Sequence, residues 1–440
     1  MSREYEADVP GGAALPGALS DALRAELIAF RRDMHMHPEL GNQEFRTTAA
    51  LKARLEQAGL KPRVLDIGTG LICDIGLDAG EGAGEGAGEG AGEGDGDGER
   101  AGVRTGVRDG AVDGGRGMLA LRADIDALPI PDTKSDCAYR STVPGRAHAC
   151  GHDVHTTVVL GAGLVLAELH RQGLLPHPVR LIFQPAEEVL PGGAPDAIES
   201  GVLDGVGRII GVHCDPKVDA GRIGLRHGPI TSACDRLEVS LDGAGGHTAR
   251  PHLTTDLVTA AARVVTDVPS LVARRVDARS GLAVTWGRIE SGHACNVIPQ
   301  HAELSGTVRC LDLDAWRQAP DLVHAAIDEI ANLYRAKSEI NYIRGVPPVV
   351  NDPAVTELLH EAMTSRRGPH SVEDTEQSLG GEDFSWYLEH VPGAMARLGV
   401  RTPGERTTRD LHRGDFDADE SAITVGVELF TAAALLDAIR

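Results

Sequence analysis

The order of apolar and polar positions in residues 20–59 predicts two helices. The first begins at the N-cap candidates Ser20 and Asp21, places apolar residues three or four positions apart, and ends near Pro38. The second covers residues 47–58 and stops at Gly59, a residue type that favours helix ends. Each helix carries its apolar residues on one face, which is typical of a helix packed against a core.

Short apolar runs follow, and they are typical of buried strands. The predicted strands cover residues 71–75, 118–123, 179–185 and 208–213, and a helix covers residues 154–171. This alternation of strands and helices predicts an α/β domain with a largely parallel sheet. In such sheets ligands bind beyond the carboxyl ends of the strands, where we expect Asp124, Glu187, Glu188 and His213.

A different pattern begins near residue 228. The predicted elements are strand 235–242, helix 255–275, strands 282–290 and 301–309, helix 314–336 and strand 338–344. The order βαββαβ is the ferredoxin-like arrangement. After residue 348 the α/β pattern resumes and ends in a helix of about residues 420–439. We therefore expect a small domain, residues 228–345, inserted into a larger domain made of residues 1–227 and 346–440.

Residues 79–98 consist of Gly-Ala-Gly-Glu repeats between two predicted strands. Such a tract cannot bury enough apolar surface to offset the entropy lost on ordering. We expect a disordered insertion in a surface connection, and a calcium-binding acidic loop is the alternative interpretation.

The composition is that of a globular protein with an acidic charge balance. The 440 residues exceed the size at which one core stops growing, so two domains are expected. Lys and Arg total 43 against 65 Asp and Glu, and the net charge of −22 argues against nucleic acid and anionic membranes as partners. The chain has no membrane-length apolar run and no signal-peptide pattern, and its seven cysteines are scattered. We therefore expect a cytoplasmic protein.

Residue types that bind divalent metals gather near the predicted strand ends. Thiolate, imidazole and carboxylate together suit zinc or a similar ion, and two adjacent ions can polarise a carbonyl and acidify a shared water. Neighbouring strand residues point in opposite directions, so one of Glu187 and Glu188 can bind metal while the other transfers protons. The pool of candidate ligands is Asp124, Asp126, Cys150, His152, His155, Glu187, Glu188, His213 and His412.

Each of these signals is weak when taken alone. A Cys-x-His pair occurs often by chance, adjacent glutamates are usually solvated, and His213 can be a hydrogen-bonded core residue. We expect ordinary hydrogen-bonding roles for His148 and His155, which flank the ligand motif. The accumulation of such clusters in one domain nevertheless predicts a metal-dependent hydrolase.

Longer motifs resemble a known family. They are RDMHMHPEL at 32–40, LRADIDALPI at 121–130, VPGRAHACGHD at 143–153, FQPAEE at 183–188, GGHTARPH at 245–252, NVIP at 296–299, GGEDF at 380–384 and LH at 411–412. Together they resemble the M20 peptidase family of metal-dependent amidohydrolases, in the branch that holds bacterial aminoacylases, hippurate hydrolases and auxin-conjugate hydrolases. The resemblance implies a zinc-exopeptidase-like α/β catalytic domain with an inserted ferredoxin-like (βαββαβ) lid and dimerisation domain.

The resemblance also implies roles for individual residues. Cys150 would bridge two divalent ions and His152 would bind one of them, while Glu187 would be the general base. The ions would be zinc or manganese, with cobalt or nickel also compatible. We expect Asp124 and Asp126 to orient ligating histidines, the alternative being turn carboxylates that end a strand. The remaining implied ligands are Glu188, His213 and His412.

The small domain would contribute to the same site. His247 lies on a glycine-rich turn and would stabilise an oxyanion, either in its own subunit or in a partner, because the resemblance implies a homodimer through this domain. Asn296 and Arg309 would suit a substrate carboxylate, although Arg309 can equally be a surface strand charge. Gly381 would let the backbone approach the substrate or the metals closely.

The resulting hypothesis is a binuclear amidohydrolase that cleaves small N-acyl amino acids to a carboxylic acid and a free amino acid. A dipeptidase or carboxypeptidase on the same scaffold is the nearest alternative. Glu187 argues against a non-catalytic binding protein. A structural zinc protein would carry three or four clustered cysteines, whereas here Cys150 alone is a candidate ligand among the cysteines.

Overall fold

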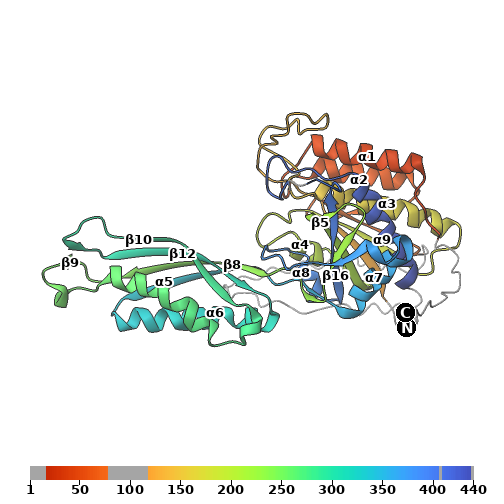
Figure 1. The fold of residues 1–440 in the computed structure, drawn as a ribbon. Coiled ribbons are helices and arrows are strands. Elements are labelled where there is room, and N and C mark those ends of the chain that lie inside the picture. The colour runs from red at the N-terminus through yellow and green to blue at the C-terminus, as the bar shows by residue number, and fades with distance from the viewer. Residues whose placement is uncertain (1–15, 78–116, 406–408, 438–440) are drawn as a thin grey trace, which may run out of the picture.

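An eight-stranded sheet and a four-stranded sheet form the centres of two bodies in the computed structural model, and the smaller body projects away from the larger one (Figure 1). The structure describes residues 16–77, 117–405 and 409–437. The Gly/Glu tract at 79–98 lies outside the described residues. Within these ranges, no helix combines the length and the apolar character needed to cross a membrane.

The large sheet is mixed. β3 (Met118–Asp124) pairs in parallel with β4 (Val179–Gln184) and β5 (Val206–Asp219), and β5 pairs in parallel with β16 (Gly393–Arg401). Antiparallel pairs join β2 to β4 and β6 to β16, so the largely parallel sheet expected from the sequence is found only in part. The strand order is β1 (Arg63–Val64), β2 (Leu71–Ile75), β4, β3, β5, β16, β6 (Ile223–Leu225) and β15 (Val372–Asp374).

Two layers of helices cover the large sheet. Alternate residues of a strand point to opposite faces, so Leu119 and Leu121 of β3 join one core and Ala120 joins another. The helices of the first core are α1 (Asp21–Met36), α2 (Phe45–Gln57), α3 (His152–Arg171), α7 (Pro353–Arg367) and α9 (Ser421–Asp437). Short helices α4 (Ala194–Glu199) and α8 (Ser385–Leu388) pack on the second face.

Local sequence explains how two of the helices begin. The Ser20 hydroxyl accepts a hydrogen bond from the backbone N–H of Leu23 at 3.2 Å, which caps α1 as its sequence predicts. α3 follows Gly151, whose φ of 86° is left-handed. A Cβ at Gly151 would lie 2.7 Å from Sγ of Cys214, so glycine also allows the segment with Cys150 to pass close to β5.

The small domain has the predicted βαββαβ order and one antiparallel sheet. Its strand order is β10-β12-β8-β13, which is the ferredoxin-like arrangement. Short strands β9 (Gly246–His247) and β11 (Val297–Ile298) pair at its far end. The main elements are β8 (Ala233–Asp242), α5 (Leu257–Ala273), β10 (Ala283–Ser291), β12 (His301–Cys310), α6 (Leu313–Leu333) and β13 (Lys337–Val346).

Two adjacent chain segments connect the small domain to the large one. β7 (Gly228–Pro229), on the way out, pairs with β14 (Val350–Asn351), on the way back. The first and last strands of the small domain are also paired, with Cys234 opposite Val346. We propose that residues 228–345 form the inserted domain, because both of its ends lie at this double connection.

Candidate metal centre

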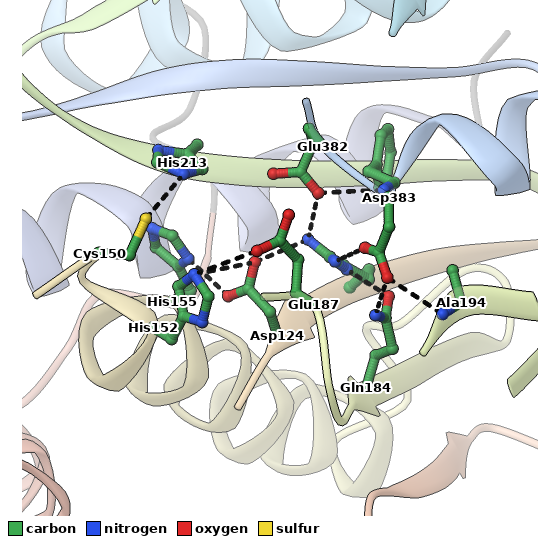
Figure 2. Close-up of polar contacts among 12 residues, drawn as sticks. Asp124, Cys150, His152, His155, Gln184, Glu187, Ala194, His213, Glu382 and Asp383 are labelled. Carbon is green, nitrogen blue, oxygen red and sulfur yellow. Dashed lines mark hydrogen bonds and ion pairs between the residues drawn. The ribbon is translucent and has the colours of Figure 1, made fainter. Parts of the chain in front are cut away.

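Five of the candidate ligands come together in two overlapping groups. The donor atoms of Cys150, His152 and His213 all lie within 4.8 Å of one another, and Sγ of Cys150 is 3.5 Å from Nε2 of His213. A second group within the same limit consists of Cys150, Glu188 and His412. Cys150 belongs to both groups, and Figure 2 shows its sulfur directed toward His213. A thiolate shared by two donor groups is placed to bridge two ions.

The donor atoms fit divalent cations. Nε2 of His152 and Oε1 of Glu188 are buried and have no hydrogen-bond partner within the described part of the chain. A buried polar atom without a partner is costly, and a cation in each donor group would satisfy these two atoms. Sulfur, nitrogen and oxygen donors together suit zinc and other borderline divalent ions. The residues present therefore fit a centre of two divalent metal ions.

Hydrogen bonds hold two of these histidines with one ring nitrogen directed toward the centre. Nδ1 of His152 lies 2.9 Å from the carbonyl oxygen and 3.2 Å from Oδ1 of Asp126. Nδ1 of His213 lies 2.8 Å from the carbonyl oxygen of Cys214. Such partners fix the proton on Nδ1 and leave Nε2 free to bind a cation. The second oxygen of Asp126 accepts the backbone N–H of Glu188 at 3.0 Å, so Asp126 contacts both donor groups.

Asp124 orients His155, which is not one of the implied ligands. Its Oδ1 lies 2.7 Å from Nδ1 of His155, whereas its Oδ2 is 3.8 Å from Nε2 of His152. Nε2 of His155 accepts the backbone N–H of Cys214 at 2.8 Å. Both ring nitrogens of His155 are thus engaged, which agrees with a hydrogen-bonding role rather than a ligand role. His148 is buried, and neither of its ring nitrogens has a hydrogen-bond partner among the residues described.

Glu187 and Glu188 lie in a turn beyond the end of β4, as expected, because Ala186 has a left-handed φ of 59° and turns the chain. The alternation of strand side chains therefore does not apply to this pair, and the expectation that His213 ends its strand is wrong. His213 lies inside β5 and not at its end. β5 continues to Asp219 because β16 runs beside it, with Arg401 opposite Asp219 after a register shift.

The two adjacent glutamates have different surroundings. Glu188 shares a donor group with Cys150 and His412. Burial alone would raise the pKa of Glu188, but His412 and His152 lower it. Burial raises the pKa of Glu187, and the nearby carboxylates of Glu382 and Glu188 raise it further. Among the described residues, the Glu187 carboxylate makes one ion-pair contact, 3.9 Å from Oε2 to Nε2 of His152. Glu187 also forms a group with His152 and Glu188 within 4.8 Å, so the two glutamates differ in that Glu188, and not Glu187, shares a group with Cys150.

A buried ion network next to Glu187 was not predicted from the sequence. The Arg122 guanidinium contacts Oδ2 of Asp124 at 2.8 Å, Oε1 of Glu382 at 3.2 Å and Oδ1 of Asp383 at 2.6 Å. Gln184 donates to the other oxygen of Asp383 at 2.6 Å (Figure 2). Burial raises the pKa of Asp383 to about 7, against the opposing effect of Arg122. An arginine inside the apolar run of β3 was the available sequence signal for this network.

The structure does not bring His247 or Asn296 together with the donor groups. His247 is exposed in β9, and the backbone oxygen of exposed Asn296 accepts the N–H of Thr248 at 3.2 Å. Figure 1 places β9 at the end of the small domain that lies away from the large sheet. Roles for both residues in the site remain predictions that require a movement of the small domain or a second copy of the chain.

Arg309 and Gly381 lie at the junction of the two domains. Nη1 of Arg309 donates to the carbonyl oxygen of Leu379 at 2.6 Å. A Cβ at Gly381 would lie 2.9 Å from Cγ2 of Val346 and 3.0 Å from Cβ of Cys234. The close approach at Gly381 is therefore to strands of the small domain, and its predicted contact with a substrate stays a prediction.

Comparison with known proteins identifies the family. The pattern that defines Peptidase family M20/M25/M40 matches residues 120–436. The chain belongs to this family. The crystal structure of a dinuclear metal-binding M20 peptidase from Bacillus subtilis superposes with a TM-score of 0.74 at 31% identity, covering 96% of this chain and 99% of that one. The zinc-exopeptidase-like fold expected from the motifs is thereby confirmed.

Relatives of this M20 chain carry several names. N-acetyl-L-cysteine deacetylase of Bacillus subtilis is 36% identical over 91% of this chain and 85% of its own length. Thermostable carboxypeptidase 2 of Saccharolobus solfataricus is 32% identical over 91% of this chain and 92% of its own length. A Rhodococcus jostii protein named "Putative glutamate--cysteine ligase 2-3" is 44% identical, but this chain spans only 47% of its length. The chain is a hydrolase of the M20 family, whose relatives act on amide bonds.

Proposed function

We propose that this M20 hydrolase cleaves N-acyl amino acids to a carboxylic acid and a free amino acid, using two divalent metal ions. One observation carries the proposal: Cys150 belongs to both donor groups, while Glu187 shares a group with His152 and Glu188 but not with Cys150. The centre therefore offers two cation positions and a further carboxylate next to them. The similarity to an N-acetyl-L-cysteine deacetylase supports an N-acylated amino acid as substrate.

The two proposed ions share Cys150 and otherwise have different ligands. Cys150, His152 and His213 would hold one ion, and Cys150, Glu188 and His412 would hold the other. When bound, the ions supply Lewis acidity toward an amide carbonyl and lower the pKa of water. Glu187 takes a proton from the attacking water on a carboxylate oxygen and then delivers it to the leaving nitrogen.

The small domain would complete the site. His247 donates a hydrogen bond to the oxyanion once β9 comes close to the donor groups, which either domain closure or a partner subunit would achieve. β10 is one of the two outer strands of the small sheet and has an unpaired edge within the described residues. An unpaired edge strand can pair with the same strand of a second copy, and this supports the proposed homodimer through the small domain.

A carboxypeptidase is the second candidate, because the Saccharolobus relative bears that name. Both substrate classes have a free carboxylate next to the scissile amide. They differ on the acyl side of the amide. A peptide has a free amino group or further amino-acid residues there, whereas an N-acyl amino acid has a simple acyl group. A site that selects N-acyl amino acids would therefore discriminate against dipeptides with a free N-terminus.

Amine release from a panel of substrates tests the proposal. The purified protein is supplied with zinc, manganese, cobalt or nickel and incubated with N-acetyl, N-benzoyl and N-fatty-acyl amino acids and with dipeptides. We expect release from the acylated amino acids that exceeds release from dipeptides and stops on addition of a chelator. Preference for dipeptides would establish the peptidase instead.

The matched variant is Glu187→Gln, which keeps the size of the side chain and removes the base. We expect this variant to bind the same amount of metal as the wild type and to lose at least about 100-fold in kcat. Full turnover by the metal-loaded variant would refute the role of Glu187.

A further inference from the structure

Lys134 is a buried lysine that has a partner for each of its three N–H donors. Its side chain is 6% exposed, and Nζ contacts the carbonyl oxygen of Phe416 at 3.0 Å and Oδ2 of Asp132 at 3.1 Å. The third partner is Nε2 of His35 at 2.9 Å. Because an ammonium can only donate, Nε2 of His35 accepts this bond, and Nδ1 of His35 donates to Oδ2 of Asp153 at 2.7 Å.

Two of the chain segments that Lys134 joins carry proposed metal ligands. Asp153 follows His152 directly in α3, and Phe416 lies four positions after His412. His152 and His412 belong to different donor groups. Lys134 therefore connects a segment of one donor group to a segment of the other.

The backbone at His412 is strained and needs support from its surroundings. Its φ of 59° is left-handed, a conformation that residues other than glycine keep only where neighbouring structure holds them. The side chain of His412 is 56% exposed, so packing does little to fix it. Its backbone N–H donates to the carbonyl oxygen of Ala149 at 2.8 Å. The rest of the support has to come from the residues that follow.

The residues after this strained position rest on the irregular segment that contains Lys134. The carbonyl oxygen of Gly414 accepts the backbone N–H of Thr133 at 2.8 Å, and a Cβ at Gly414 would overlap the carbonyl oxygen of Pro131. Two positions further on, Lys134 donates to the carbonyl oxygen of Phe416. Thr133 acts through its backbone, whereas the contact of Lys134 depends on its side chain.

We propose that Lys134 is a positioning residue for His412, and that it thereby sets the affinity of the ion in the donor group with His412. Burying an ammonium is costly, and its full set of partners offsets that cost while it fixes two ligand segments relative to one another. The inference rests on the two-ion centre of the proposed function and deepens it with a residue outside both donor groups.

Zinc titration of the metal-free protein tests the proposal without reference to turnover. Affinities are measured in competition with a fluorescent chelator, and bound ions are counted by plasma mass spectrometry. We expect Lys134→Met to bind the ion of the His412 group about 10- to 100-fold more weakly than the wild type. The other ion should keep its affinity, because Arg31 also binds Asp153, at 2.7 Å, and holds the start of α3 without Lys134.

A double-mutant cycle separates positioning of His412 from general support of the centre. In a His412→Ala background the residue that Lys134 positions is gone. Adding Lys134→Met to this background should therefore change the affinity of the remaining ion by less than about 2-fold. If Lys134→Met does not fold, Lys134→Gln, which keeps a polar end group, is measured in its place with the same expected result.

Arg180→Met is the matched control for loss of a buried cation. Arg180 likewise joins a carboxylate, that of Asp74, to carbonyl oxygens, those of Val202 and Asp204. None of these residues belongs to a donor group among the described residues. Arg180→Met should lower the thermal unfolding midpoint at least as much as Lys134→Met does, and should still bind both ions with wild-type affinity.

Several outcomes would overturn the proposal. They are an unchanged affinity for both ions in Lys134→Met, equal weakening of both ions, and the same loss of one ion in Arg180→Met. A further loss of more than about 2-fold in the His412→Ala background would also overturn it. If Lys134→Met selectively loses one of two ions but the wild type hydrolyses no N-acyl amino acid, the proposed function fails and the positioning role stands.

Discussion

The Oδ1 atom of Asp126 lies 3.2 Å from Nδ1 of His152, while its Oδ2 atom accepts the N–H of Glu188 at 3.0 Å. A single buried carboxylate thus orients a residue of each donor group. We expect Asp126→Ala to lower metal affinity by about 10- to 100-fold, because partners of this kind fix the orientation of ligands. Competition with a fluorescent chelator measures the change, with Asp66→Ala, an exposed carboxylate, as control. Unchanged affinity in Asp126→Ala would show that the contact has no role in metal binding.

The shared position of Cys150 predicts how metal content responds to substitution. Because Cys150 belongs to both donor groups, Cys150→Ala should weaken binding of both ions. His412→Ala and His213→Ala each remove a residue from one group, so each should retain one ion. Metal content after dialysis, measured by plasma mass spectrometry, distinguishes these patterns. Loss of a single ion from Cys150→Ala would contradict a bridging thiolate.

The ion network around Arg122 predicts a large loss of stability on its removal. Arg122→Met would leave Asp124, Glu382 and Asp383 buried without their shared cation. We expect the free energy of unfolding to fall by about 3–5 kcal/mol, the usual cost of breaking a buried pair from one side. Urea denaturation measures it, and Arg279→Met, which removes an exposed ion pair with Asp277, should have no measurable effect. A comparably small change in Arg122→Met would mean that the carboxylates are neutralised in another way.

The buried Glu44 predicts a dependence of stability on pH. Burial raises the pKa of Glu44 from 4.5 to about 7, while its Oε1 accepts the N–H of Ala186 at 2.8 Å. The unfolded chain releases this proton at lower pH than the folded protein does, so stability is lost as the pH rises from 4.5 through 7. The loss should approach about 3 kcal/mol by about pH 8.

Glu44→Gln keeps the acceptor for Ala186 and removes the titration. We expect the wild type to become less stable than this variant between about pH 5 and about pH 8, when the two are compared by urea denaturation. Two stability curves that stay parallel over this window would contradict the raised pKa of Glu44.

The position of β9 predicts that His247 acts on a partner subunit, since it lies at the end of the small domain away from the large sheet (Figure 1). Mixing subunits of Glu187→Gln and His247→Ala should then restore activity, because one site of each mixed dimer has both residues intact. Random mixing would give about a quarter of the wild-type sites. Each inactive variant alone is the control. If the mixture stays as inactive as its components, His247 serves its own subunit.

The sequence predicts features set by short-range pattern and misses those set by pairing across the chain. The cap at Ser20, the βαββαβ order of the small domain and the candidate ligands all follow from local spacing or motifs. The contact between Arg122 and Asp383 joins residues 261 positions apart, and although an arginine inside the apolar run of β3 indicates a buried partner, neither local sequence identifies that partner. The position of His213 inside β5 likewise depends on the register with β16. Strand ends are determined by neighbouring strands, which explains why the predicted length of β5 is wrong.

The paired connection at β7 and β14 has a consequence for how this architecture can arise. The chain leaves the large domain beside the point where it returns, with the N–H of Ile230 donating to the carbonyl oxygen of Val349 at 2.9 Å. A segment whose two ends are neighbours can be spliced into or out of a host protein with little loop entropy and without displacing any host strand. We therefore expect the large domain with the metal-binding residues and the small domain with His247 to be separable units of inheritance, each exchangeable while the other keeps its fold.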